Sequence, residues 1–262
     1  MKRLLIPALL VCPLWAGCLK FKEEVQVMPD GAGRIVLSVS SKDTGEANKM
    51  SVGELMSEDP DKMDKTLPGI VAMSRPVEEK KDGWTTVTVE FFFEDLNKVK
   101  LVNEDDGKVM QEFAFRKEGA GHAVEFKSGA ADELGGELGG ADGDLPPEAK
   151  KQMEEMVKQM LAGFEMRIAV LMPGPVTEAG AFKDKEGRRA AFAIGEKDIA
   201  GFGDFKKFEA VKSVKVLSGP ADVPPAEQAA FKAAFDKAKA EWPQLKKEMK
   251  ANFEKKAKEK KE

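Results

Sequence analysis

Apolar and polar residues alternate on both sides of a glycine-rich turn near the start of the chain, and this alternation limits the fold more than any other feature. A strand places alternate side chains on opposite faces, so residues of one parity form one face. The turn is PDGAG, residues 29–33, in which Gly31 and Gly33 are expected to take positive φ. The residues that share one parity are Phe21, Glu23, Val25 and Val27 before the turn, and Ile35, Leu37 and Val39 after it. Residues 20–41 therefore predict a β-hairpin.

Two further hairpins are predicted before the middle of the chain. Residues 70–93 alternate around a turn at 81–83, and residues 109–117 and 122–129 flank a Glu-Gly-Ala-Gly turn. His122 opens the last of these strands. The second half contains three more strand-like runs, at residues 164–176, 188–195 and 208–219.

Two helical segments are predicted in the middle of the chain. Residues 46–67 form a polar segment that breaks near Asp59-Pro60. A second helix begins at Pro146-Pro147, since proline suits the first helical position. Its apolar residues follow helical spacing and predict one buried stripe: Met153, Met156, Val157, Met160, Leu161 and Phe164. Packing on the sheet is the expected role of this stripe, and lining of a lipid groove by methionine is the alternative.

From Pro224 onward the sequence predicts a helix to the end of the chain. Its apolar face consists of Phe231, Phe235, Ala238, Trp242, Leu245, Met249 and Phe253. Pro243 is expected to kink this helix or divide it in two. We expect the stretch from Phe231 to Trp242 to pack on the body of the protein and the stretch beyond Pro243 to project. The lysine-rich end is interpreted as a solvated helix end, with contact to anionic lipid as the alternative.

The order of these elements predicts the α+β class. We expect a largely antiparallel sheet built from β-hairpins, with packed amphipathic helices and a long C-terminal helix. The predicted organisation is a signal peptide at 1–17, an α+β domain at 18–223 and a C-terminal amphipathic, Lys-rich helix at 224–262. Residues 128–147 are rich in glycine, alanine and aspartate and are interpreted as a flexible loop inserted in one domain. A boundary between two domains at this loop is the alternative.

The first eighteen residues have the pattern of a secretory signal. Lys2 and Arg3 precede a short apolar run that ends at Trp15, and this run is too short to span a bilayer. The sequence Leu-Trp-Ala-Gly-Cys at 14–18 resembles the bacterial lipobox, with Trp15 where leucine is usual. That resemblance implies cleavage before Cys18 and acylation of its thiol. An ordinary secreted protein with a free Cys18 is the alternative.

A lipobox at Cys18 has consequences for the mature chain. Cys12 leaves with the signal, so the folded domain has no thiol for a disulfide. The several acyl chains of such lipoproteins hold a membrane lastingly, whereas a single chain holds it weakly. The expected localisation is the cell envelope, and Leu19 after Cys18 favours the outer membrane, facing the periplasm or the cell surface.

The charge balance excludes one class of partner. Loss of Lys2 and Arg3 takes two positive charges from a net charge of −4 and leaves −6. A mildly acidic chain of this kind has no basic footprint for nucleic acid. The expected partners are the membrane, through acylated Cys18, and a lipid or an envelope protein. The oligomeric state is not predicted.

No metal or cofactor is expected. Residues 103–108 offer Asn103 and Asp105 as calcium ligands, but Gly107 stands where the third side-chain ligand is required, so a plain turn is predicted. Asp142 and Asp144 form a similarly weak pair. Zinc is not expected because His122 has no histidine or cysteine partner in the folded domain.

No catalytic residue is assigned. The chain has no G-x-S-x-G motif and no phosphate-binding glycine loop before a helix. Acidic residues number 46, so carboxylate pairs arise by chance and do not identify a glycosidase-like site. The prediction is a protein without enzymatic activity. A carboxylate-dependent envelope hydrolase is the alternative, and two acids of perturbed pKa in one pocket would favour it.

Three features in order resemble the LppM-type domain of bacterial envelope lipoproteins. They are a strand directly after Cys18, the turn at Asp30-Gly31-x-Gly33, and Pro173-Gly174-x-Val176 after the strand MRIAVLM. The resemblance covers residues 18–218. The family's Asn-Gly turn and its following Trp are replaced by Ala179-Gly180 and Phe192. The resemblance to this family implies a non-enzymatic α+β domain and lipid or glycolipid binding.

Overall fold

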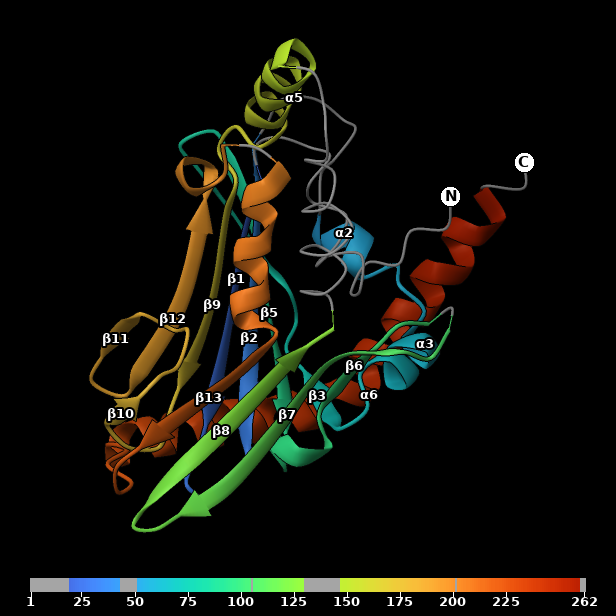
Figure 1. Cartoon of the computed structure of the whole chain (residues 1–262). Coiled ribbons are helices and arrows are strands. Elements are labelled where there is room, and N and C mark those ends of the chain that lie inside the picture. Colours follow the sequence, from blue (N-terminus) through green and yellow to red (C-terminus); the bar gives the residue numbers. More distant parts are fainter. Residues whose placement is uncertain (1–18, 43–50, 105, 130–146, 201, 260–262) are drawn as a thin grey trace.

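The strands form two sheets that pack face to face, with helices at their ends and edges (Figure 1). This computed structural model describes residues 19–42, 51–104, 106–129, 147–200 and 202–259. The predicted α+β class is confirmed, and pairing is antiparallel except between two strands. The strands divide into two sheets, whereas the sequence led us to expect one.

The larger sheet contains the first two predicted hairpins, which are confirmed. Its order is β11-β12-β9-β1-β2-β5-β3, with β4 also paired to β5. The parallel pair is β1 with β9, which joins the N-terminal hairpin to the second half of the chain. Its strands are β1 (Leu19–Val27), β2 (Gly33–Lys42), β3 (Ile70–Met73), β4 (Val77–Lys81), β5 (Trp84–Phe93), β9 (Glu165–Leu171), β11 (Asp184–Glu186) and β12 (Arg189–Gly195).

The smaller sheet contains the third predicted hairpin, also confirmed, in the order β10-β13-β8-β7-β6. Its strands are β6 (Lys100–Val102), β7 (Val109–Glu118), β8 (Gly121–Ser128), β10 (Val176–Glu178) and β13 (Ser213–Ser218). The strand predicted to start at residue 208 starts only at Ser213. The preceding residues form a 3₁₀ helix, η6 (Phe202–Val211), because one turn of three residues places Phe208 and Val211 on one side, and both are buried.

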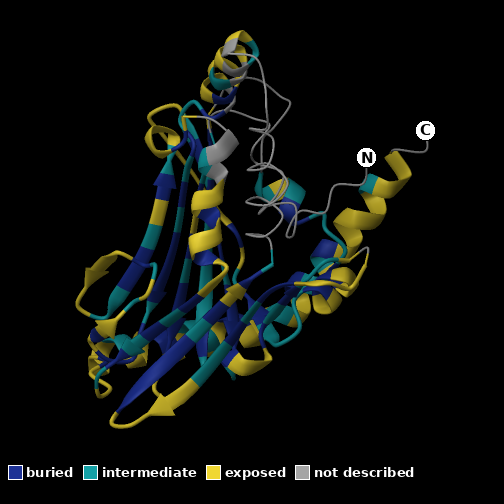
Figure 2. Ribbon diagram, in the orientation of Figure 1, coloured by how far each residue is buried: buried dark blue, intermediate teal, exposed yellow. Residues whose placement is uncertain are grey.

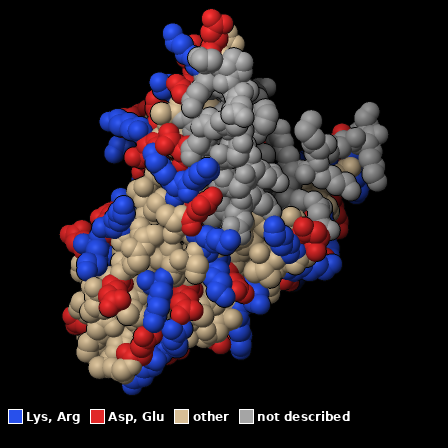
Figure 3. Space-filling model, viewed as in Figure 1, with Lys and Arg blue, Asp and Glu red and all other residues tan. Residues whose placement is uncertain are grey.

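The main core lies between the two sheets and follows the parity read from the sequence (Figure 2). Phe21 and Val25 of β1 and Val39 of β2 point inward from the larger sheet, and Phe113 and Phe126 point inward from the smaller one. The opposite face of the smaller sheet carries charges of both signs, which are mixed over the face shown in Figure 3. Cross-strand ion pairs there include Arg116 with Glu125 at 2.7 Å and Lys215 with Glu118 at 2.9 Å. Such a face is a solvated one.

The first turn needs its two glycines for different reasons, which corrects the prediction for Gly33. Gly31 has φ +88°, as expected. Gly33 lies in β2 without a positive φ, but a Cβ there would lie 2.0 Å from the Gln26 carbonyl oxygen and 2.6 Å from the Phe93 ring. Gly33 therefore provides space for a close approach and not a special backbone angle.

Two short helices lie within the segment predicted at residues 46–67, of which residues 51–67 are described. The predicted break is real: α2 (Val52–Leu55) ends before Asp59, which caps α3 (Pro60–Thr66) by accepting from the Asp61 N–H at 3.0 Å. The other short helices are the 3₁₀ turns η3 (Leu96–Lys98) and η5 (Glu196–Asp198).

Helix α5 (Pro147–Met160) only partly matches its predicted stripe. Val157, Leu161 and Phe164 are buried in the main core, but Met156 is 47% exposed. The side chains of Met153 and Met160 lie outside the described part. The stripe is therefore narrower than its spacing indicated, because the sheets cover only one end of this helix.

Helix α6 (Pro225–Glu259) is one helix that continues through Pro243, so the expected division does not occur. Its first half packs Phe231 and Phe235 against Phe92 of β5, with Phe235 stacked on that ring at 5.6 Å. Beyond Pro243, Leu245 (2% exposed) and Met249 are also buried, which corrects the expectation that this stretch projects. The prediction was wrong because α2, α3 and β3 cover this face, and their position is not visible in the helix's own spacing.

Ion pairs fix the second half of α6 on α3. Lys246 Nζ lies 2.6 Å from Asp64, and Lys250 Nζ lies 2.9 Å from Asp61. The helix thereby covers the outer edge of β3, which would otherwise present unpaired backbone groups. No helix in the described ranges is long and apolar enough to cross a membrane.

Leu245→Ala should lower the free energy of unfolding by about 3 kcal/mol, since it leaves a cavity between α6 and the cluster around Met63. Phe253→Ala is the matched control on the same helix, because that ring is 36% exposed, and it should change the value by less than about 1 kcal/mol. Urea denaturation followed by circular dichroism measures both. Equal, small effects would mean that the second half of α6 is not packed.

Candidate functional site

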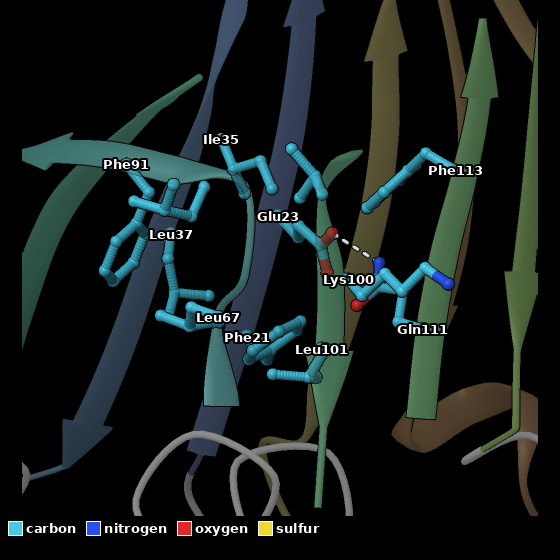
Figure 4. Close-up of a pocket in the computed structure, with 12 residues that line it drawn as sticks. Phe21, Glu23, Ile35, Leu37, Leu67, Phe91, Lys100, Leu101, Gln111 and Phe113 are labelled. Carbon is cyan, nitrogen blue, oxygen red and sulfur yellow. Dashed lines mark hydrogen bonds between the residues drawn. The ribbon is translucent and has the colours of Figure 1, made fainter. Parts of the chain in front are cut away.

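A cavity of about 60 Å³ lies between the two sheets (Figure 4). Strands β1, β2 and β5 form one wall, β6 and β7 form the other, and the segment between α3 and β3 closes one side. Its walls are mainly hydrophobic, with side chains that include Phe21, Ile35, Leu37, Phe91, Leu101 and Phe113. It is a mainly apolar space at the margin of the core and is partly open, since Ile35, Leu37 and Leu67 in its lining are only half-buried.

Two polar side chains meet inside this cavity. Glu23 comes from β1 and is 6% exposed, and Gln111 comes from β7 and is 5% exposed. Gln111 Nε2 donates a hydrogen bond to Glu23 Oε1 at 2.8 Å, which Figure 4 shows as a dashed line. This bond links the two sheets directly.

The parity of the strands explains why these side chains point inward. Glu23 shares its face of β1 with Phe21 and Val25, and Gln111 shares its face of β7 with Phe113. Strand alternation placed Glu23 on the apolar parity but indicated no role for it, and no pattern in the sequence singled out Gln111. The signal was present, because a carboxylate in the apolar register of a central strand must be buried.

Burial raises the pKa of Glu23 to about 7, and the hydrogen bond from Gln111 opposes this rise only in part. Lys100 also lines the cavity, but it pairs across the strands with Glu112, with Nζ 3.9 Å from the Glu112 carboxylate. No cation in the described part of the chain contributes to the pKa of Glu23. The carboxyl is therefore buried without a counter-charge.

His122 is the second buried titratable side chain and lies outside this cavity. It is near the start of β8, as predicted, and stacks on Phe115 with ring centroids 5.4 Å apart. Burial, followed by the charge of Lys117, lowers its pKa, and its Nδ1 is buried without a partner. In the described ranges no group of three His, Cys, Asp or Glu residues is placed to hold a metal.

Of the remaining candidates from the sequence, Asn103 is the one that lies in the described part of the chain, and it does not line the cavity. Asn103 lies in a plain turn, as predicted, where its carbonyl accepts from the Gly107 N–H at 2.9 Å. Cys18, Asp105, Asp142 and Asp144 lie outside the described residues.

The two-carboxylate arrangement that would favour a hydrolase is not found in the cavity. Glu23 is the one acid among the described residues that line it. Glu58 also has a raised pKa, mainly from burial, but it lies between α2 and α3 and does not line the cavity. The lining of the cavity is apolar apart from Lys100 and the hydrogen-bonded pair of Glu23 and Gln111.

Comparisons with known proteins identify no family for this chain and only weak likenesses to solved structures. No protein-family model and no curated protein matches the chain. Among solved structures it is similar to the NMR structure of the folded domain of LppM from Mycobacterium tuberculosis, with a TM-score of 0.36 and 13% identity over 81% of this chain and 94% of that one. It is also similar to an M1 zinc metallopeptidase from Deinococcus radiodurans, with a TM-score of 0.22 and 8% identity over 78% of this chain and 42% of that one. The LppM likeness is a weak resemblance of fold, and at these TM-scores neither likeness carries an argument about function.

Glu23→Gln should remove a pH dependence of stability. The pKa of Glu23 rises from 4.5 to about 7 on folding, so between these values the native protein keeps a proton that the unfolded chain releases. Stability therefore falls as pH rises through this window, by roughly 3 kcal/mol in total at about 1.4 kcal/mol for each pKa unit. Glu23→Gln should lose less stability than the wild type between pH 5 and pH 8, as measured by urea denaturation.

Glu24→Gln is the control for this measurement. Glu24 lies next to Glu23 but on the other face of β1, where it accepts a hydrogen bond from Arg189 at 2.7 Å. Its replacement should leave the fall between pH 5 and pH 8 in place. A Glu23→Gln variant whose stability runs parallel to the wild type would show that Glu23 titrates normally.

Proposed function

We propose that this chain is a lipid-anchored protein of the bacterial envelope that binds an amphiphile in the cavity between its sheets, without catalysis. The cavity carries this proposal. It is lined mainly by aliphatic and aromatic side chains and contains one hydrogen-bonding pair, which is the usual composition of a site for an apolar ligand.

One wall of the cavity is suited to adapt to a ligand. Ile35, Leu37 and Ile70 line the cavity and also pack against a buried cluster rich in methionine. The methionines of that cluster are Met56, Met63, Met73 and Met249. Methionine side chains are unbranched and flexible, so such a wall can move aside for a ligand larger than the empty space.

The position of the cavity in the chain supports a ligand taken from a membrane. Phe21 lines the cavity and is three residues after Cys18, the expected lipid attachment site. Three residues of extended chain span about 10 Å. An acylated Cys18 would therefore hold the first strand, and the cavity behind it, near the bilayer surface.

The absence of catalysis remains part of the proposal. A hydrolase that uses two carboxylates needs a second acid beside Glu23, and the described lining residues do not provide one. A single carboxyl with a hydrogen-bonded amide is sufficient for ligand binding.

Leu37→Trp should abolish the retention of an amphiphile by filling the cavity. The full-length protein is purified from the membranes of the bacterium that produces it, and native mass spectrometry measures bound small molecules beyond the covalent anchor. The wild type should carry a bound amphiphile and Leu37→Trp should not. Leu101→Trp fills the same space from the other sheet and repeats the test if the first variant does not fold.

Val36→Trp is the matched control, because Val36 is the next residue of β2 and lies on the opposite face, beside Glu24 and Glu90. It should keep the bound amphiphile. A wild-type protein without a bound molecule, or cavity variants that retain as much as the wild type, would contradict the proposed function.

Cys18→Ser should move the protein from the membrane fraction to the soluble fraction, because the anchor is expected to be the acylated thiol. Fractionation of cells followed by immunoblotting measures this, and metabolic labelling with a palmitate analogue should label the wild type alone. A Cys18→Ser variant that stays in the membrane and is processed as before would overturn the lipid anchor.

A further inference from the structure

Glu23 lowers the stability of the fold at neutral pH without any compensation by charge. A buried carboxylate is normally paired with a cation or held by several hydrogen bonds. Glu23 has one hydrogen bond, from Gln111, and its neighbours across the strands are Leu37 of β2 and Ile168 of β9. A residue that opposes stability in this way is typical of a binding site.

Two acceptor oxygens in the cavity have no hydrogen-bond donor among the described residues. Gln111 Nε2 donates to one oxygen of Glu23, and no described residue donates to the second oxygen of Glu23 or to Gln111 Oε1. The fully enclosed polar side-chain atoms without a partner, within the described ranges, are His122 Nδ1 and Arg167 Nε. The two free oxygens are therefore accessible to a molecule in the cavity.

We propose that the cavity binds the polar end of an amphiphile when that end donates hydrogen bonds, as a hydroxyl or an ammonium group does, and disfavours a carboxylate. This inference rests on the proposed function and specifies the ligand class. A donor placed between Glu23 and Gln111 would satisfy both free acceptors. A ligand carboxylate would add a second negative charge beside Glu23 with no cation facing the pair.

The size of the cavity sets which part of the ligand enters. Its volume of about 60 Å³ is less than half of the roughly 150 Å³ of a cavity that takes one benzene molecule. Only a polar end and its first few carbons fit without movement of the walls. The rest of the ligand's chain either extends out of the open side of the cavity or enters when the wall moves aside.

The affinities for an ammonium ligand and for a carboxylate ligand should depend on pH in opposite directions. The groups that face Glu23 are Leu37, Ile168 and Gln111, while the Lys100 ammonium is paired with Glu112. Among the described residues that line the cavity, Glu23 is thus the one whose charge changes between pH 6 and pH 8. Its ionised fraction rises about tenfold between pH 6 and pH 8 for a pKa of about 7.

The test compares three probes with the same eight-carbon chain: 1-octanol, octylammonium and octanoate. Isothermal titration calorimetry measures their binding to the full chain carrying Cys18→Ser, so that no bilayer competes for the probes. At pH 8, octanol and octylammonium should bind more tightly than octanoate. From pH 6 to pH 8 the affinity for octylammonium should rise by up to about tenfold and that for octanoate should fall.

Glu23→Gln should abolish the pH dependence and reduce the preference for octylammonium over octanoate by about tenfold. Glu24→Gln, on the outer face of β1, should change neither. Octanoate binding as tightly as octanol at pH 8, or an unchanged preference in Glu23→Gln, would overturn this inference and leave amphiphile binding intact. If none of the three probes binds, the proposed function fails, and this inference fails with it.

Discussion

The inner face of β1 is the feature on which the rest of the structure depends. This strand pairs with β2 on one side and with β9 on the other, and its inward side chains form the centre of the core between the sheets. Phe21 and Val25 contribute the hydrophobic contact that holds the two sheets together. Because β9 comes from the second half of the chain, its parallel pairing with β1 joins segments far apart in sequence in one sheet. Loss of that register would move every inward side chain to the solvent face.

One residue on the inner face of β1 departs from the apolar pattern of that face. Glu23 occupies a position where the alternation requires an apolar residue, and the core leaves a cavity around it. The free-energy penalty of a buried carboxyl is reduced here by protonation and by one hydrogen bond from Gln111, not by a cation. A fold that tolerates such a group has one hydrogen-bonding group inside an otherwise apolar space. That combination gives a binding cavity its specificity, since apolar walls alone accept any chain of suitable width.

Helix α6 shows how tertiary packing overrides a local rule. Proline inside a helix removes one backbone hydrogen bond and clashes with the preceding turn, so Pro243 alone favours a break. The helix continues because its second half buries Leu245 and Met249 against α2 and α3 and forms ion pairs with Asp61 and Asp64. In doing so it covers the edge of β3, and the cluster that it completes packs against Ile35, Leu37 and Ile70, which line the cavity. The C-terminal helix is therefore part of the body that shapes the site.

The sequence alone determined the elements whose signals are local. Side-chain parity predicted the three hairpins, the Asp59-Pro60 pair predicted the break before α3, and the spacing from Phe231 to Met249 predicted one apolar face of α6, although not the burial of its second half. Parity also placed Glu23 among core residues, although nothing nearby indicated its partner. Only the tertiary structure decided that the strands form two sheets, that β1 pairs with β9, and that Glu23 meets Gln111, which is 88 residues away. The physical reason is that periodicity reports which face of an element is buried, whereas the surface that buries it is set by contacts between segments distant in the chain.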